Sequence, residues 1–212
     1  MASQDSSMQL KTKQINNLMI VGTTHLTPSC EILKIIDEFK PTIVGLELCP
    51  TRFKVFIGQI NTTNSQKDDS IIGQITEETK KKATENNIDY ASDQKTAMFY
   101  ALNNNLKLVL LDKDINEINM SMTKIPLEEL TYLQNELLKY KEQKLEKEVN
   151  EEEVINTMKR DIPNVFKILV EERNEFIANK IKECVNENKD KRIIVFIGKG
   201  HEKEIRRLLN IQ

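Results

Sequence analysis

The chain has 212 residues, of which 39% are hydrophobic and 30% are charged, and its formal net charge is −2 at neutral pH. This length suits one sizeable α/β core, and the composition lies far from that of an intrinsically disordered chain. A nearly balanced charge excludes the basic field that holds nucleic acid or an anionic membrane through phosphate contacts, so we expect neither as a partner.

The N-terminal segment and the apolar runs predict a soluble protein that stays inside the cell. Residues 1–16 are polar and unpatterned, so we expect a flexible tail followed by a single domain over 17–212. No run approaches the roughly 20 apolar residues of a membrane span, so we expect no membrane insertion and a cytoplasmic location. The cysteines Cys30, Cys49 and Cys184 form no CxxC pair, which favours reduced thiols over a disulfide framework.

Short apolar runs predict the strands of a central sheet, at residues 18–22, 42–48, 106–111 and 192–198. Their continuous hydrophobicity is typical of strands that are covered on both faces, as in a parallel sheet with helices above and below. Helical patterns at 29–40 and 92–105 lie between these runs, which indicates strand, helix, strand units. We therefore expect an α/β fold with a mostly parallel central sheet flanked by helices.

A large helical insertion precedes the last predicted strand. From residue 126 to 188 the chain is almost wholly helical in pattern, with one break near Pro163, whereas 60–70 reads as an exposed loop. The charge run at 141–153 fits a solvated helix face or a turn between helices. The insertion is longer than a simple crossover between two strands, so we expect a helical lobe over 126–188 beside the sheet. This lobe is also a candidate surface for a homodimer.

Polar residues follow each predicted strand, at the place where open α/β sheets bind their ligands. The runs end in GTTH, ELC, LDKD and GKGH, which places four side chains at one edge of the sheet: His25, Glu47, Asp112 and His201. These are the only two histidines of the chain, and each stands three residues after a glycine. We expect the glycine to let the chain turn sharply out of the strand, so that the histidine projects over the edge.

Each of these residues also has a structural interpretation. Either histidine can be a hydrogen-bonded structural side chain, and Asp112 can cap the following turn. Glu47 lies between two leucines, where a carboxylate needs a partner because an isolated buried charge is costly, and a structural salt bridge would supply one. Cys49 shares a strand face with Glu47, which leaves a Cys–His nucleophilic site as a further alternative.

Arg173 interrupts the apolar stripe of the helix predicted within 163–185, where a leucine would be expected. A buried guanidinium needs a carboxylate, and loss of that partner typically costs about 3–5 kcal/mol. We therefore expect Arg173 to point towards the strand edge, with Glu47 or Asp112 as its counter-charge. The alternative is a side chain that snorkels to solvent.

Several motifs resemble those of the TraB/PrgY family, and they stand in the same order. The stretch GTTHLTPSCEILKIIDEFKPTIVGLELCPTR resembles the family's opening pattern of GTxH, an amphipathic helix, a strand, and ELC or ELD followed by Arg. LLDKDI, EERNEFIANKI and FIGKGHEKEI resemble three later motifs of the family. Two positions depart from the pattern, because Lys113 stands where Arg is usual and Glu204 stands where Gly is usual.

The resemblance implies a fold akin to the TIKI proteases and the erythromycin-esterase-like proteins, which pair two GxxH motifs with an acidic residue and an arginine. TIKI relatives are metal-dependent peptidases that prefer manganese or cobalt. TraB/PrgY members are linked to the shutdown of peptide pheromones, by degradation or by sequestration. Carried over by position, the implied site is His25, Glu47, Arg173 and His201, with Arg52, Asp112, Asp114 and Glu172 as further candidates.

The first hypothesis is a metal-dependent hydrolase that acts on a peptide or another carbonyl substrate. His25, His201 and Glu47 would supply three ligands to manganese, cobalt or zinc and leave one position for water, or Glu47 would act as general base. Arg173 would stabilise the oxyanion or orient the carboxylate. The alternatives are a non-catalytic protein that binds a peptide or an anion near GKGH, and a scaffold that dimerises through its helical lobe.

Overall fold

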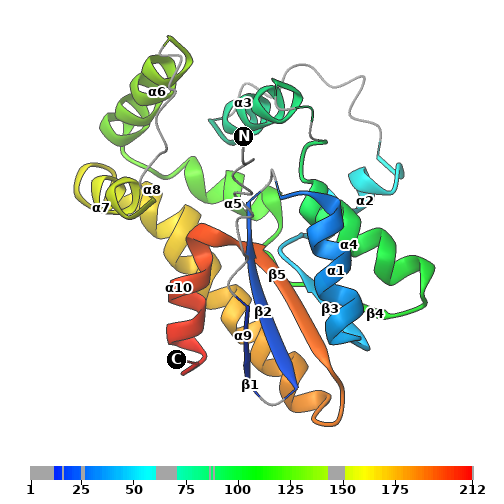
Figure 1. Cartoon of the computed structure of the whole chain (residues 1–212). Helices are drawn as coiled ribbons and strands as arrows, with labels where there is room; N and C mark the ends of the chain where they lie inside the picture. The colour runs from blue at the N-terminus through cyan, green and yellow to red at the C-terminus, as the bar shows by residue number, and fades with distance from the viewer. Residues whose placement is uncertain are drawn as a thin grey trace, which may run out of the picture.

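The computed structural model describes residues 12–15, 17–24, 27–60, 71–85, 87, 89–142 and 151–211. A five-stranded sheet in the order β1, β2, β5, β3, β4 forms its centre (Figure 1). The strands are β1 (Thr12–Ile15), β2 (Leu18–Thr23), β3 (Ile43–Leu46), β4 (Lys107–Leu110) and β5 (Ile193–Gly198). β2, β5, β3 and β4 pair in parallel, and β1 runs antiparallel to β2. The predicted α/β fold with a mostly parallel sheet is confirmed.

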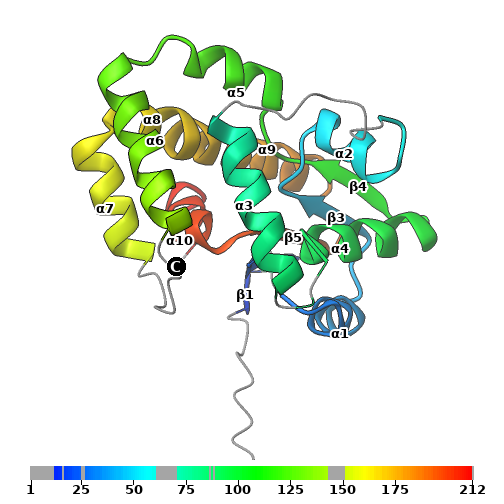
Figure 2. The ribbon, with the colours of Figure 1, turned by 90° about the horizontal axis from the view of Figure 1, so that it is seen from above.

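Helices cover both faces of this sheet, as Figure 1 and Figure 2 show from two directions. One face packs against α1 (Ser29–Phe39) and α4 (Ser92–Asn103), and the other against α9 (Glu172–Glu187) and α10 (Lys199–Leu208). Side chains alternate along a strand, so neighbouring residues of β5 enter different cores. Both faces are buried, which explains why the strands are continuous apolar runs in the sequence.

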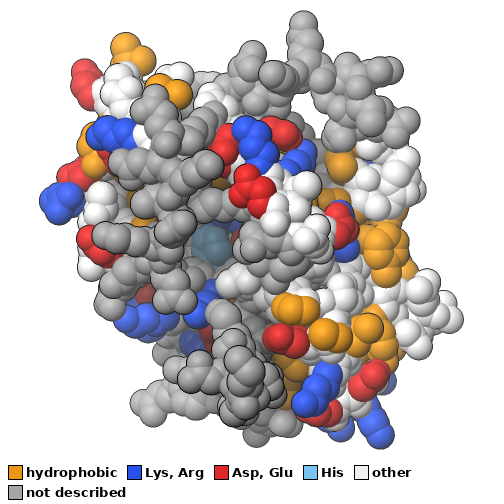
Figure 3. All heavy atoms as spheres, turned by 45° about the horizontal axis from the view of Figure 1, so that its top comes forward, with side chains coloured by type: hydrophobic (Ala, Val, Ile, Leu, Met, Phe, Trp, Pro, Cys, Tyr) orange, Lys and Arg blue, Asp and Glu red, His pale blue; other side chains and the backbone are white. Residues whose placement is uncertain are grey.

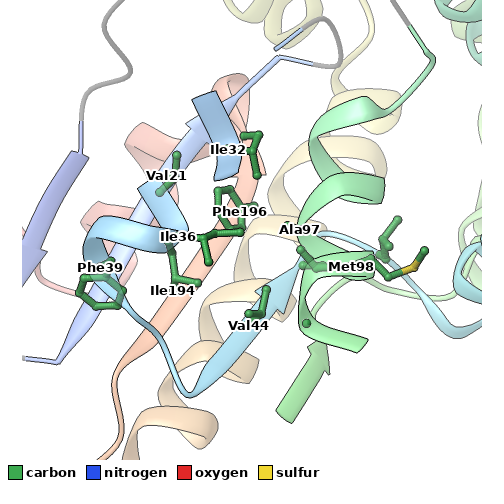
Figure 4. Close-up of a cluster of buried hydrophobic side chains, with 12 residues drawn as sticks. Val21, Ile32, Ile36, Phe39, Val44, Ala97, Met98, Ile194 and Phe196 are labelled. Atoms are coloured by element: carbon green, nitrogen blue, oxygen red, sulfur yellow. The ribbon is translucent and has the colours of Figure 1, made fainter. Parts of the chain in front are cut away.

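The core on the α1 and α4 face illustrates this packing (Figure 4). Ile36 of α1 and Met98 of α4 belong to the same cluster as Val44 of β3 and Phe196 of β5, and each is less than 1% exposed. On the opposite face, Val195 of β5 packs in a second cluster with side chains of α9. This two-sided burial fixes the positions of the strand ends that carry the polar residues.

The edge strand β1 corrects the prediction of a flexible tail up to residue 16. Residues 12–15 pair antiparallel with the outer side of β2, with Thr12 opposite Val21 and Ile15 opposite Leu18. Pairing of this kind uses backbone groups that an open sheet edge offers, so it needs no apolar pattern in the sequence. Residues 1–11 and residue 16 lie outside the described residues.

A helical lobe lies beside the sheet, in yellow-green at the upper left of Figure 1. It contains α5 (Ile115–Met122), α6 (Leu127–Glu142), α7 (Glu151–Asp161), α8 (Pro163–Phe166) and a π-helical turn, η1 (Lys167–Glu171). Its own core is formed by Ile118, Met122, Ile125, Ile162 and Val165. The predicted insertion before the last strand is present, and the chain breaks between α7 and α8 next to Pro163, as expected.

The boundaries of the lobe differ from the predicted range 126–188. The lobe begins earlier, with α5, and α9 leaves it to pack against the sheet through Ile177 and Ile181. An apolar stripe indicates that a helix is buried but not which partner buries it, so the sequence could not separate α9 from the lobe. Residues 143–150, within the predicted charge run, lie outside the described residues.

Two further helices flank the carboxyl ends of the strands. α2 (Pro50–Phe56) follows β3, and α3 (Ile71–Glu85) lies above the strand ends in both Figure 1 and Figure 2. α3 contacts α6, and its Ile72 packs against the lobe core. Most of the predicted loop at 60–70 lies outside the described residues.

Two surface properties bear on the expected partners. None of the helices in the described ranges is both long enough and apolar enough to cross a membrane. On the face shown in Figure 3, the Lys and Arg side chains of the described residues lie among Asp and Glu side chains rather than apart from them.

Candidate functional site

The candidate site lies at the carboxyl edge of the sheet, where the chain leaves three neighbouring strands. Glu47 directly follows β3, Asp112 follows β4 by two residues, and His201 lies in the first turn of α10, just after β5. The backbone N–H of Glu47 donates to the carbonyl of Phe196 at 3.1 Å, so the chain still pairs with β5 at this point. The topology therefore places these side chains together, as the sequence analysis expects from parallel strands.

Arg173, at the start of α9, joins the two carboxylates. Its Nη2 donates to Glu47 Oε1 at 2.7 Å and to Asp112 Oδ2 at 2.9 Å, and its Nε donates to Asp112 Oδ1 at 3.0 Å. Its Nη1 donates to the carbonyl of Leu169 at 3.1 Å. Arg173 thus meets both carboxylates that the sequence analysis offers as its counter-charge, and the Arg173 side chain is 15% exposed.

Glu47 is held as a carboxylate. Its Oε2 accepts the backbone N–H of Gly198 at 2.5 Å, while Oε1 accepts Arg173. Burial alone would raise the pKa of Glu47, but His201, Arg173, the Gly198 N–H and Arg52 together lower it from 4.5 to about 2. Burial also opposes the charge of Arg173, and Asp112 and Glu47 raise its pKa above the ordinary value.

His201 turns one ring nitrogen towards this ion pair. Its Nε2 lies 3.6 Å from Glu47 Oε1 and 3.4 Å from Arg173 Nη1, and its Nδ1 lies 2.7 Å from Asn174 Oδ1. Because Asn174 Oδ1 can only accept a hydrogen bond, Nδ1 donates to it, and this contact fixes the orientation of the ring.

The glycines of the two GxxH frames provide space rather than a sharp turn. Gly22 and Gly198 lie within β2 and β5, and neither has a positive φ. A Cβ at Gly22 would lie 2.0 Å from Glu202 Oε2, and a Cβ at Gly198 would lie 3.2 Å from Glu47 Oε2. This corrects the expected role of these glycines, because each one lets a carboxylate of another element approach the strand end.

Two of the described side-chain atoms have the separation that ligands of one divalent ion can have. Bonds of about 2.0–2.2 Å to nitrogen and oxygen place two ligands of one ion about 3–3.6 Å apart, and the 3.6 Å between His201 Nε2 and Glu47 Oε1 meets this requirement. Within the described residues, no group of three or more His, Cys, Asp or Glu side chains is arranged to hold a metal. His25, the third ligand in the metal hypothesis, lies outside them.

The other candidates from the family resemblance occupy different positions. Arg52 lies in α2, close enough to Glu47 to help lower the pKa of that carboxyl. Asp114 caps α5 and accepts the Thr51 hydroxyl at 2.8 Å; the backbone N–H of Asn116 is the main cause of its lowered pKa. Glu172 pairs with Lys113 at 2.9 Å rather than with the central ion pair.

Cys49 acts as a helix cap in this structure. It is 1% exposed, and its Sγ accepts the backbone N–H of Arg52 at the start of α2. All the cysteines of the chain are free thiols, as the sequence analysis expects. The Cys–His alternative therefore has no support from a contact between Cys49 and His201 among the described residues.

A polar group on the other side of β5 was not predicted from the sequence. Thr23, at the end of β2, donates its hydroxyl to Asp93 Oδ2 at 2.5 Å, and Gln94 Nε2 donates to the carbonyl of Phe196 at 3.4 Å. Asp93 and Gln94 are each 1% exposed. Gln94 Oε1 has no hydrogen-bond partner among the described residues, although a buried carbonyl oxygen normally has one. Their partners lie far away along the chain, so the spacing of residues 92–94 carries no signal for this group.

Comparison with known proteins adds one relative. No family model matches the chain. The chain is 28% identical to an uncharacterized protein of Methanocaldococcus jannaschii over an alignment 218 positions long, which covers 91% of this chain and 53% of the relative. The chain therefore spans about half the length of that curated relative. Because the relative is itself described as uncharacterized, the similarity assigns no activity.

Proposed function

We propose that the chain is a metal-dependent hydrolase of the TraB/PrgY and TIKI type, which cleaves a peptide or another carbonyl substrate. The observation that carries the proposal is the meeting of Glu47, His201 and Arg173 at one sheet edge, with His201 Nε2 3.6 Å from Glu47 Oε1. A purely structural ion pair would not require an imidazole that a second side chain, Asn174, turns towards the carboxylate. The His201 side chain remains 15% exposed, so solvent reaches it.

Glu47 and His201 would hold the divalent ion, and His25 of the GTTH motif is the proposed third ligand. A manganese, cobalt or zinc ion bound there would lower the pKa of a coordinated water towards neutrality. A carboxyl with a pKa of about 2 is a weak proton acceptor at neutral pH. This value favours a role for Glu47 as a metal ligand over its alternative role as general base.

Arg173 and Asn174 are positioning residues in this proposal. Arg173 already donates to two carboxylates and one carbonyl, so it holds Glu47 in place rather than waiting for a developing oxyanion. Asn174 accepts from His201 Nδ1 and thereby keeps Nε2 directed at the site, a support that metal-binding histidines commonly have.

Metal analysis of protein purified without a histidine tag tests the proposal. We expect about one bound ion per chain in the wild type and cleavage of unstructured peptides that manganese, cobalt or zinc stimulates. His25→Ala, His201→Ala and Glu47→Gln should each reduce metal binding at least tenfold. Glu204→Gln is the matched control, because Glu204 lies on the same helix as His201 and pairs with Arg207 at the surface.

Two results would overturn the proposal. If the three site variants retain metal as the wild type does, the ion is bound elsewhere. If the wild type binds no metal, and added ions change neither its melting temperature nor peptide cleavage, then a protein that sequesters its ligand becomes the better account.

A further inference from the structure

We infer that Arg52 binds a carboxylate group of the substrate beside Glu47, and that Tyr90 positions Arg52 for this contact. The inference deepens the proposed function and rests on it, since it names the substrate class of the same site. For a peptide, the carboxylate would be the C-terminal group or an acidic side chain.

The contrast between two arginines at the same edge carries the inference. Arg173 is saturated, because both of its carboxylate partners and the Leu169 carbonyl lie within hydrogen-bond distance. Arg52 donates from Nη2 to the hydroxyl oxygen of Tyr90 at 3.3 Å, and no carboxylate of the described residues lies within 4.0 Å of its guanidinium. A guanidinium carries five N–H donors, so Arg52 keeps donors for a ligand.

Arg52 is positioned by Tyr90, which in turn contacts α3. It projects from α2, Tyr90 lies in the turn before α4, and Lys80 of α3 lies with its Nζ 6.0 Å from the centre of the Tyr90 ring. Lys80 pairs in turn with Glu77 on the same helix. Arg52 and Tyr90 are both partly exposed, so a ligand at the strand ends can reach them.

The surrounding charges select a carboxylate over a phosphate. Glu47, Asp112 and Asp93 lie at the same strand ends, so a dianion would meet more repulsion than a monoanion. The planar fork of a guanidinium pairs with two oxygens of either a carboxylate or a phosphate, so the charge of the ligand decides between them.

Calorimetric titration of the full chain with four probes tests this inference. The probes are N-acetyl-Ala-Ala with a free acid, its C-terminal amide, N-acetyl-Ala-Asp amide, and inorganic phosphate. We expect at least one of the two acids to bind about tenfold more tightly than the neutral amide and more tightly than phosphate. The acid that does so identifies whether the carboxylate is terminal or on a side chain.

Variants then assign the preference to Arg52. Arg52→Gln should remove the preference for the acid and leave affinity for the amide unchanged, and Arg52→Lys should retain part of it. Tyr90→Phe should weaken acid binding about two- to fivefold, since it loosens Arg52 without removing the charge. Arg207→Gln is the matched control, because Arg207 is exposed on α10 and pairs with Glu204. Melting temperatures establish that each variant is folded.

Equal binding of acids and amide would overturn the inference, as would a loss in Arg52→Gln that affects all probes alike. Tighter binding of phosphate than of either acid would overturn it as well. The titration does not require the peptide bond to be cleaved, so a failure of hydrolysis and a failure of carboxylate selection are separate results.

Discussion

A single guanidinium organises the carboxyl edge of the sheet. Arg173 replaces the leucine that the apolar stripe of its helix would carry, and it brings charge into a place that is largely closed to water. The arrangement is stable because both partner carboxylates and the Leu169 carbonyl accept its hydrogens. Its removal would leave two acidic groups close together without compensation.

Arg173→Met should therefore destabilise the fold by about 3–5 kcal/mol, the usual cost of breaking a buried ion pair from one side. Urea unfolding followed by circular dichroism measures this change. Adding Asp112→Asn to the variant should restore part of the loss, because it removes one of the two orphaned charges. Arg207→Met, at an exposed pair on α10, should leave the unfolding midpoint unchanged. An Arg173→Met protein as stable as the wild type would contradict the burial of this charge.

The pKa of Glu47 predicts how stability depends on pH. The pKa of the Glu47 carboxyl is about 2 in the folded chain and 4.5 in the unfolded chain, so the unfolded chain binds a proton over the range in which the folded chain does not. The ionised Glu47 carboxyl therefore contributes about 3 kcal/mol to the free energy of unfolding. This contribution is complete above pH 5 and is lost as the pH falls from 4.5 towards 2.

Unfolding free energies measured in urea between pH 7 and pH 3 check this dependence. Glu47→Gln should be less stable than the wild type at pH 7 and should lose less stability on acidification. Parallel pH profiles for the two proteins would show that another carboxyl is responsible.

Helices and strands were predictable from the sequence where their burial leaves a hydrophobic pattern. The parallel strands are covered on both faces, so their apolar runs predict their ends within one residue, except that 42–48 extends two residues past the end of β3. β1 pairs through its backbone alone, so it had no pattern to find, and α3 was not predicted. The helix α9 was predicted but was assigned to the lobe, because its apolar stripe could pack against either the lobe or the sheet.

The close packing of β3 gives a test at this scale. A Cβ at Gly45 would lie 2.9 Å from Leu111 Cδ1 and 3.1 Å from Val195 Cγ2, both on branched side chains within the core. Gly45→Ala should destabilise the protein by about 1–3 kcal/mol, as overpacked cores do. Gly200→Ala is the control, since a Cβ there meets nothing within 4 Å and α10 gains a better helix former. In thermal unfolding, the melting temperature should fall for Gly45→Ala and rise for Gly200→Ala.

The site was partly predictable for the same reason as the strands. Parallel topology alone brings Glu47, Asp112 and His201 to one edge, and Arg173 was conspicuous because it breaks an apolar stripe. The pairing of Glu172 with Lys113 could not be read from the chain, since spacing along one helix does not state which neighbour a side chain reaches. Asp93 was missed because its partner, Thr23, is 70 residues away.

As a whole, the molecule has a large layered body and a smaller lobe. Among the described residues, the two cores of the sheet contain twelve and eleven buried apolar residues, whereas the lobe core contains five. Since local stability follows the apolar surface that an element buries, the lobe should open more readily than the sheet. The homodimer through this lobe stays a prediction.

Hydrogen exchange followed by mass spectrometry tests this difference. The free energy of opening that is measured by amide exchange should be smaller for α6 and α7 than for β5. Ile162→Ala, in the lobe core, should lower lobe protection by about 2–5 kcal/mol and leave the protection of β5 nearly unchanged. An equal loss in both regions would mean that lobe and sheet unfold as one unit.

The π-helical turn η1 connects the helices of the lobe to α9. Glu172 N–H bonds to the carbonyl of Lys167, five residues back, so this turn holds more residues than an α-helical turn. One residue added to or removed from a helix rotates everything beyond it by about 100°. A change of length here would rotate α7 and α8 relative to α9, and it would displace the Leu169 carbonyl that Arg173 contacts. The bonds of Arg173 to Glu47 and Asp112 join α9 to the strand ends, so they depend on η1 only through that carbonyl.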